Sequence, residues 1–156
     1  MNEYRITKYD PSLRNTSGAH RPDEWTSYSD VGRLVSLEEY LATEARYVKT
    51  AVALLGEAGV RSLEALGVEN RAAAAPAEGA MLAPAEWPIA FRSVLREECW
   101  CRFEAEAGFV HFGYDYYMYV GVRCQDDVAQ AAALSRGRFV EPWVSPYHPE
   151  DEHDKT

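Results

Sequence analysis

The chain has 156 residues, of which 47% are hydrophobic and 12% aromatic, and its formal charge is −9. This composition is typical of one folded domain with a sizeable core, and it excludes an intrinsically disordered chain. No cluster of Lys and Arg accompanies the acidic excess, which argues against a nucleic-acid partner, because phosphates are bound by cations. A basic protein is the more natural partner, although net charge also serves solubility.

Targeting signals and cysteines indicate the compartment. The first ten residues lack the apolar segment of a signal peptide, and no apolar run approaches the roughly 18 residues of a membrane span. The three cysteines, without a secretory context, indicate reduced thiols. We therefore predict a cytoplasmic protein without membrane contact.

The first part of the chain predicts a strand, a long loop and a helix. Residues 4–9 are β-branched and aromatic, as in a strand, and 10–24 form a polar loop with Pro and Gly. Ser36 and Glu39 have the spacing of a capping box. The helix predicted over 37–58 has apolar residues spaced by three and four and ends at a glycine: Leu37, Leu41, Ala45, Val48, Val52, Leu55 and Gly59.

The remaining elements alternate between strands and helices. Residues 67–84 are rich in Ala, Pro and Gly, and we predict a surface excursion there. The other predicted elements are a strand at 60–66, a helix at 88–98, a half-buried strand at 99–105, a strand or hairpin at 110–121, a helix from Asp126 to Gly137 and a last strand at 139–144.

This element order defines a fold class. The order β-α-β-α-β-β-α-β predicts a single α+β domain over residues 1–147, in which helices cover one face of a mostly antiparallel sheet. Residues 148–156 carry four acidic groups and one basic group, and they are predicted to form a flexible tail.

The segment 110–121, VHFGYDYYMYVG, concentrates aromatic and polar chemistry. As one strand it would direct an apolar set toward the core and a mixed set to the opposite face. The apolar set is Val110, Phe112, Tyr114, Tyr116, Met118, Val120 and Val122, and the mixed set includes His111, Asp115, Tyr117 and Tyr119. Gly113 also allows a bulge or a tight turn, and a turn would redistribute both sets.

Two functions are compatible with the mixed set. Tyrosine is enriched at protein interfaces, and an aspartate beside tyrosines suits a cationic side chain. We therefore predict a partner-binding surface made of His111, Asp115, Tyr117 and Tyr119, with Glu24 and Trp25 at its rim. The alternative is a small enzyme or small-ligand-binding domain that uses His111, Asp115 and the tyrosines. Against catalysis, His111 and Asp115 would lie about 13 Å apart on one strand, so no catalytic residue is predicted.

Metal and cofactor sites are not predicted. A structural zinc site requires about four ligands, usually from Cys pairs separated by two to four residues. Cys99 and Cys101 with the distant Cys124 do not fit this spacing, and buried thiols explain them better. The glycines are scattered, which argues against a phosphate-binding loop.

Four segments together resemble a group of small bacterial cytosolic proteins. They are YRITKYDP at 4–11, EWTSYSDVG at 24–32, REECWC at 96–101 and HFGYDYYMYVG at 111–121. The resemblance covers nearly the whole chain, departs from the group in the Ala-rich segment, and implies no catalytic residues because no activity is attached to the group.

By analogy, the size, acidity and aromatic content are also similar to those of the immunity proteins of bacterial toxin systems. We thus expect a protein that neutralises a toxin, for example a basic nuclease, by covering its active site. The oligomeric state is left open.

Overall fold

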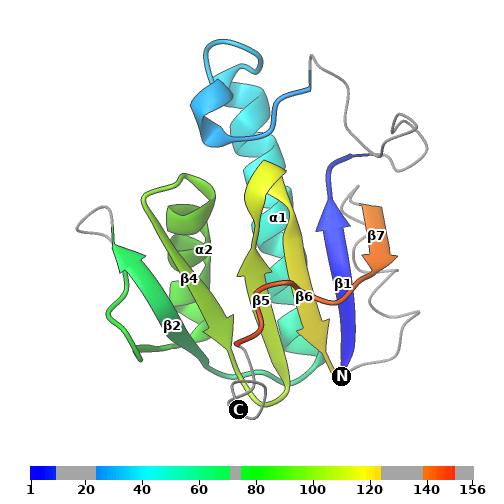
Figure 1. The fold of residues 1–156 in the computed structure, drawn as a ribbon, viewed down its shortest axis with the longest axis vertical. Coiled ribbons are helices and arrows are strands. Elements are labelled where there is room, and N and C mark those ends of the chain that lie inside the picture. Colours follow the sequence, from blue (N-terminus) through cyan, green and yellow to red (C-terminus); the bar gives the residue numbers. More distant parts are fainter. Residues whose placement is uncertain (10–23, 71–74, 124–138, 150–156) are drawn as a thin grey trace, which may run out of the picture.

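The structure is built on an antiparallel sheet with two helices on one of its faces (Figure 1). The computed structural model describes residues 1–9, 24–70, 75–123 and 139–149. The strands are β1 (Asn2–Thr7), β2 (Leu63–Asn70), β3 (Met81–Leu82), β4 (Cys99–Glu104), β5 (Gly108–Phe112), β6 (Met118–Val122) and β7 (Phe139–Pro142), and the α-helices are α1 (Leu37–Glu57) and α2 (Trp87–Leu95).

The described strands form one seven-stranded sheet in the order β3-β2-β4-β5-β6-β1-β7, and neighbouring strands are antiparallel. This confirms the predicted α+β class, with helices covering one face of an antiparallel sheet. The helix predicted from Asp126 lies outside the described residues, as does most of the predicted tail. The short edge strand β3 was not predicted.

Both ends of α1 follow the predicted signals. The Ser36 Oγ accepts a hydrogen bond from the Glu39 N–H at 3.1 Å. At the other end Gly59 has a φ of 77°, and the Val60 N–H donates to the Leu55 carbonyl at 3.0 Å, which is a Schellman ending. Local sequence therefore determines where this helix begins and ends.

The buried face of α1 differs from the predicted one. Leu37 and Leu41 are 52% and 40% exposed, so the first turns of the predicted apolar face are wrong. The buried residues of α1 are Tyr40, Thr43, Glu44, Tyr47, Val48, Thr50, Ala51, Leu54 and Leu55. Aliphatic spacing alone misplaced this face because two tyrosines and a paired glutamate occupy it.

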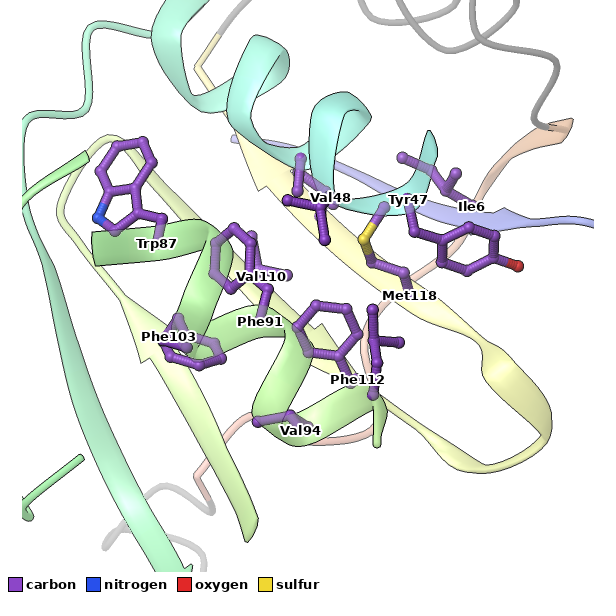
Figure 2. Close-up of a cluster of buried hydrophobic side chains, with 14 of the residues drawn as sticks. Ile6, Tyr47, Val48, Trp87, Phe91, Val94, Phe103, Val110, Phe112 and Met118 are labelled. Atoms are coloured by element: carbon purple, nitrogen blue, oxygen red, sulfur yellow. The ribbon is translucent and has the colours of Figure 1, made fainter. Parts of the chain in front are cut away.

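The core lies between the helices and the sheet. Phe91 of α2 contacts the rings of Phe103 and Phe112, with centroid distances of 5.0 and 5.7 Å (Figure 2). The cluster continues under α1 through Ile6, Tyr47, Val48, Val110 and Met118 (Figure 2). Close packing of these side chains joins β1, β4, β5 and β6 to both helices.

An ion pair with a buried carboxylate connects α1 to the end of α2. The Arg96 guanidinium donates from Nε and Nη2 to the Glu44 carboxylate at 2.9 and 2.7 Å, and the Tyr40 hydroxyl donates to the same carboxylate at 2.7 Å. Glu44 is 2% exposed. The hydrogen bond to Glu44 raises the pKa of Arg96, so the guanidinium stays charged in the pair.

The predicted surface excursion over 67–84 is partly sheet. β2 continues to Asn70 across a register shift, and β3 pairs with β2 at the sheet edge. Gly67 has a φ of 66° at the shift, and the Gly67 and Val68 N–H groups donate to the Glu78 carboxylate at 3.0 and 2.8 Å. The bond from Val68, followed by that from Gly67, lowers the pKa of Glu78. This bulge interrupts the alternation after Leu66, so the predicted strand at 60–66 did not include the second half of β2.

The segment 110–121 is a hairpin. β5 and β6 are joined by a turn that contains the short 3-10 helix η4 (Tyr114–Tyr116). Cross-strand partners such as Phe112 and Met118 are both even-numbered, so even-numbered residues keep one face in both strands. The turn therefore leaves the two predicted sets almost intact, and the exception is Tyr114, which is 86% exposed instead of buried.

Candidate functional site

A pocket of about 530 Å³ opens beside the hairpin tip, which we define as residues 113–117. Thr26 and Ser27 line it from the segment before α1. Its aromatic lining residues are Trp100, Phe112, Tyr114, Tyr116 and Tyr147, and its carboxylates belong to Glu69, Glu97 and Asp115. Among the described lining residues there is no Lys, Arg or His, so this lining carries a negative formal charge.

The backbone of the lining includes a conformation that side chains usually disfavour. Glu97, Asp115 and Tyr116 have φ values of 62°, 60° and 63°, and they are the non-glycine residues with positive φ in the described ranges. All three line the pocket. Because this conformation costs about 1–2 kcal/mol per residue, the surrounding contacts must hold it in place.

Hydroxyl groups hold the hairpin tip from the core side. The Tyr9 hydroxyl donates to the Asp115 carbonyl at 2.7 Å, and the Tyr47 hydroxyl donates to the Tyr116 carbonyl at 2.9 Å. The Tyr116 ring packs against Trp25 at a centroid distance of 5.0 Å. Burial raises the pKa of the Tyr9 hydroxyl and of the Tyr116 hydroxyl, so each of these two groups remains protonated and can donate. The tip therefore presents its outer residues in one geometry.

The end of α2 also lines the pocket, through Val94, Leu95 and Glu97. The Glu97 N–H donates to the Val94 carbonyl at 3.0 Å, and the Glu98 N–H donates to the Ser93 carbonyl at 2.9 Å, so α2 also has a Schellman ending. Glycine is the usual residue at the position that Glu97 occupies. Local stability would favour glycine here, and the chain instead places a carboxylate on the pocket wall.

Asp30 organises the segment that carries Thr26 and Ser27. The Thr26 N–H donates to Asp30 Oδ2 at 2.9 Å, and the Arg33 guanidinium donates to Asp30 Oδ1. The Thr26 hydrogen bond, together with the Arg33 guanidinium, lowers the pKa of Asp30 below 3.8. Asp30 is 5% exposed, so its carboxylate is both buried and ionised.

We expect Asp30→Asn to lower the free energy of unfolding at about pH 7, and by less at about pH 2.5. A carboxyl whose folded-state pKa is depressed contributes stability that is complete above its unfolded pKa and is lost as the pH falls through the folded value. Urea denaturation of both proteins at the two pH values measures the difference. Asparagine keeps an oxygen that can accept from Thr26, so the pH-dependent part reports the charge. An equal loss at both pH values would contradict this role.

The structure places the four predicted binding residues of the hairpin at different depths. Asp115 is exposed and Tyr117 is half-buried, whereas Tyr119 is 6% exposed and its cross-strand partner His111 is fully buried. The common exposed face expected for these residues is therefore not formed. Of the four, Asp115 is the one that lines the pocket.

Of the two predicted rim residues, Trp25 packs beneath the hairpin tip and Glu24 pairs with Lys8. Trp25 is 6% exposed, and its ring lies 4.1 Å from the Lys8 ammonium. Glu24 accepts from Lys8 Nζ at 2.7 Å. Trp25 thus belongs to the aromatic cluster under Tyr116, and a partner on the surface would not reach its ring directly.

His111 belongs to a second polar cluster, on the helix-free face of the sheet. After β7, residues 143–149 cross this face in front of β1, β6 and β5, and we call them the C-terminal strap (Figure 1). His111 Nδ1 lies 2.6 Å from Ser145 Oγ, and Nε2 lies 2.6 Å from Glu104 Oε1. The imidazole also stacks on Phe109 at a centroid distance of 4.3 Å. Because a carboxylate can only accept, Nε2 carries a hydrogen in this arrangement.

A serine, a histidine and a glutamate in series form the relay that hydrolases use to activate a nucleophile. In this chain Ser145 is 4% exposed, and its Oγ also accepts from the Tyr147 N–H at 3.2 Å. Neither Ser145 nor His111 is among the described residues that line the pocket. The hydrogen bonds of this cluster therefore attach the strap to the sheet.

We expect Ser145→Ala to destabilise the protein by about 1–3 kcal/mol, because it leaves Nδ1 of a buried imidazole without a partner. Equilibrium unfolding in urea gives the value. The double variant Ser145→Ala/His111→Phe is the control, since it removes both polar partners and keeps a ring on Phe109. The double variant should lose less stability than the sum of the losses in the two single variants. Strict additivity would argue against coupling between Ser145 and His111.

No family model, curated protein or solved structure matches this chain. Within the described residues, no helix combines the length and the hydropathy that crossing a membrane requires, and no group of three or more His, Cys, Asp or Glu side chains could hold a metal ion. Cys99 and Cys101 are free and buried, and burial raises the pKa of Cys101 to about 12, while Cys124 lies outside the described ranges. What the chain does must therefore be inferred from its own residues.

Proposed function

We propose that this chain is a cytosolic protein-binding module for a basic partner, and that it acts as an immunity protein, which neutralises a bacterial toxin by covering its active site. The observation that carries the proposal is the hairpin tip, which presents Tyr114 and Asp115 at the edge of an acidic, aromatic pocket. Exposed tyrosines are frequent anchors of protein interfaces.

The charge of the molecule supports a basic partner. The formal charge of −9 favours encounter with a protein of opposite charge, and it disfavours acidic partners. At the tip itself, the described lining of the pocket contributes carboxylates and no cation. Long-range attraction and the local surface thus select the same class of partner.

The test is capture from a lysate of the native cells with the full chain as bait, compared with Asp115→Lys and Tyr114→Ala. Tyr114 is the better aromatic position to change, because it is 86% exposed, whereas the Tyr117 ring packs against the Arg5 guanidinium. Glu57→Lys, at the last residue of α1, is the control with the same change of charge. The partner is then assayed for toxicity with and without the bait.

We expect one basic protein to be retained by the native chain and by Glu57→Lys, released by salt, and lost with Asp115→Lys. Tyr114→Ala should weaken its binding by about tenfold or more. Equal retention by all variants would exclude the hairpin tip from the interface. A captured partner whose activity is unchanged by the bait would exclude toxin neutralisation.

The size of the pocket favours a second candidate, a small-ligand-binding domain. A volume of about 530 Å³ lies in the range of small-molecule sites. The enzymatic version, with His111 and Asp115 in one site, has no support in the pocket lining, which contains Asp115 without His111. If no protein is captured, native mass spectrometry of the purified chain for a bound small molecule decides between the candidates.

A further inference from the structure

Three of the protein's own cations are held by a repeated arrangement of one carboxylate and aromatic rings. The Arg5 guanidinium is 3.7 Å from the centroid of the Trp143 ring and 4.8 Å from that of Tyr117. Its Nη2 donates to the Glu141 carboxylate at 2.7 Å. Arg5 is 7% exposed, so this arrangement compensates for nearly complete removal of the charge from water.

Two further cations follow the same arrangement. Lys8 Nζ is 2.7 Å from Glu24 and 4.1 Å from the centroids of the Tyr9 and Trp25 rings. Arg96 pairs with a buried carboxylate and lies 5.9 Å from the centroid of the Tyr28 ring. In each case charge attraction, hydrogen bonding and the negative ring face act on the same cation.

The pocket at the hairpin tip offers the same components without a cation from its described lining. Glu97 and Asp115 supply carboxylates from two different elements, the end of α2 and the hairpin tip. Trp100 and Tyr147 supply rings whose centroids are 5.5 Å apart and whose planes are tilted by 54°. Both carboxylate residues are exposed, so a ligand from solvent can reach them.

We propose that this pocket receives a guanidinium group, carried by an arginine side chain of the basic partner, an inference that rests on the proposed function. Arginine fits better than lysine, because its planar fork donates to two carboxylates and stacks on an aromatic face at the same time. The volume of about 530 Å³ leaves room for the side chain together with flanking residues of the partner.

The backbone geometry makes the site preorganised. The backbone of Asp115 and Glu97 is fixed at φ values near 60° by hydrogen bonds to their own turns and to the core, so this backbone does not have to be ordered when the cation arrives. Asparagine tolerates a positive φ at least as well as aspartate. Asp115→Asn and Glu97→Gln therefore remove charge while the turns keep their shape.

The experiment measures binding of N-acetyl-arginine methylamide by NMR, through the indole N–H signal of Trp100, which a Trp100→Phe variant assigns. The citrulline and lysine counterparts of this probe are tested alongside. We expect the arginine probe to bind, the neutral citrulline probe to bind at least tenfold more weakly, and the lysine probe to lie between them. Asp115→Asn and Glu97→Gln should each weaken the arginine probe by about tenfold, and Glu57→Gln should not.

Each alternative result has a defined meaning. Equal binding of the arginine and citrulline probes, or no shift of the Trp100 signal at saturating probe concentration, overturns the guanidinium site. A basic partner that is captured equally by the native chain, Asp115→Asn and Glu97→Gln also overturns it, while the proposed function stands. An arginine-selective pocket in a chain that captures no basic protein supports the site and overturns the protein-binding function.

Discussion

Arg96→Met is expected to lower the free energy of unfolding by about 3–5 kcal/mol, because it leaves a buried carboxylate without its cation. The Glu44 side chain is 3% exposed, so water cannot replace the two hydrogen bonds that Arg96 donates. The hydroxyl of Tyr40 would remain as a donor, and one neutral donor does not compensate for a lost charge. Equilibrium unfolding in urea measures the loss.

The reciprocal variant Glu44→Gln is the matched comparison. It leaves the Arg96 side chain, which is 31% exposed, and this guanidinium can be hydrated when its partner is gone. We therefore expect Glu44→Gln to cost less than Arg96→Met, and the double variant to cost less than the sum of both. If Glu44→Gln is the more destabilising change, burial of the carboxylate does not control the pair.

Phe91→Ala is expected to be comparably severe, at about 3–5 kcal/mol. Phe91 is fully buried, and its ring is the contact between α2 and the aromatic rings of β4 and β5. Truncation removes this apolar area from the core and leaves a cavity that two rigid neighbours cannot fill. Because Phe112 also lines the pocket, the variant should in addition weaken binding of the arginine probe.

Phe91→Leu separates cavity formation from loss of hydrophobic character. It keeps most of the volume, so we expect a loss of less than about half that of Phe91→Ala. Urea denaturation of the two variants side by side gives the comparison. Similar losses for both would show that aromatic contact with Phe103 and Phe112, and not filled volume, stabilises this part of the core.

Local signals predicted the ends of elements better than their faces. Ser36 and Gly59 act within one turn of the chain, so the ends of α1 could be predicted from a few residues. Which face of α1 is buried depends on the sheet and on Arg96, which follows at a distance of 52 residues. A pattern limited to aliphatic residues could not include Glu44, whose burial is stabilised by that distant partner.

Of the residues selected from the sequence for a binding surface, one lies in the described lining of the pocket. Asp115 was selected for its charge among tyrosines, and it does line the pocket. Tyr114 was assigned to the core because alternation continues through a segment that is in fact a turn. Glu97, Trp100 and Tyr147 come from other elements, and no local pattern indicates that the end of α2, β4 and the strap meet at the hairpin tip. The binding role of the site stays a prediction.

His111 illustrates the same limit. Its position beside an aspartate and tyrosines indicated a working surface, yet its partners are Glu104, on the preceding strand, and Ser145, which lies 34 residues away in the strap. A segment without regular structure gives no sequence signal of where it packs. The burial of the imidazole could therefore be recognised only in three dimensions.

The place of β1 between β6 and β7 has a consequence for the time course of folding. Asn2 is paired with Val122, and Tyr4 is paired with Pro142. The N-terminal strand therefore pairs with residues that lie more than a hundred positions later in the sequence. Such distant pairings slow folding, because the loop that joins them must be ordered before any contact offsets its entropy. Until β6 and β7 arrive, β1 has two unpaired edges, and this interval is when the chain is most exposed to self-association.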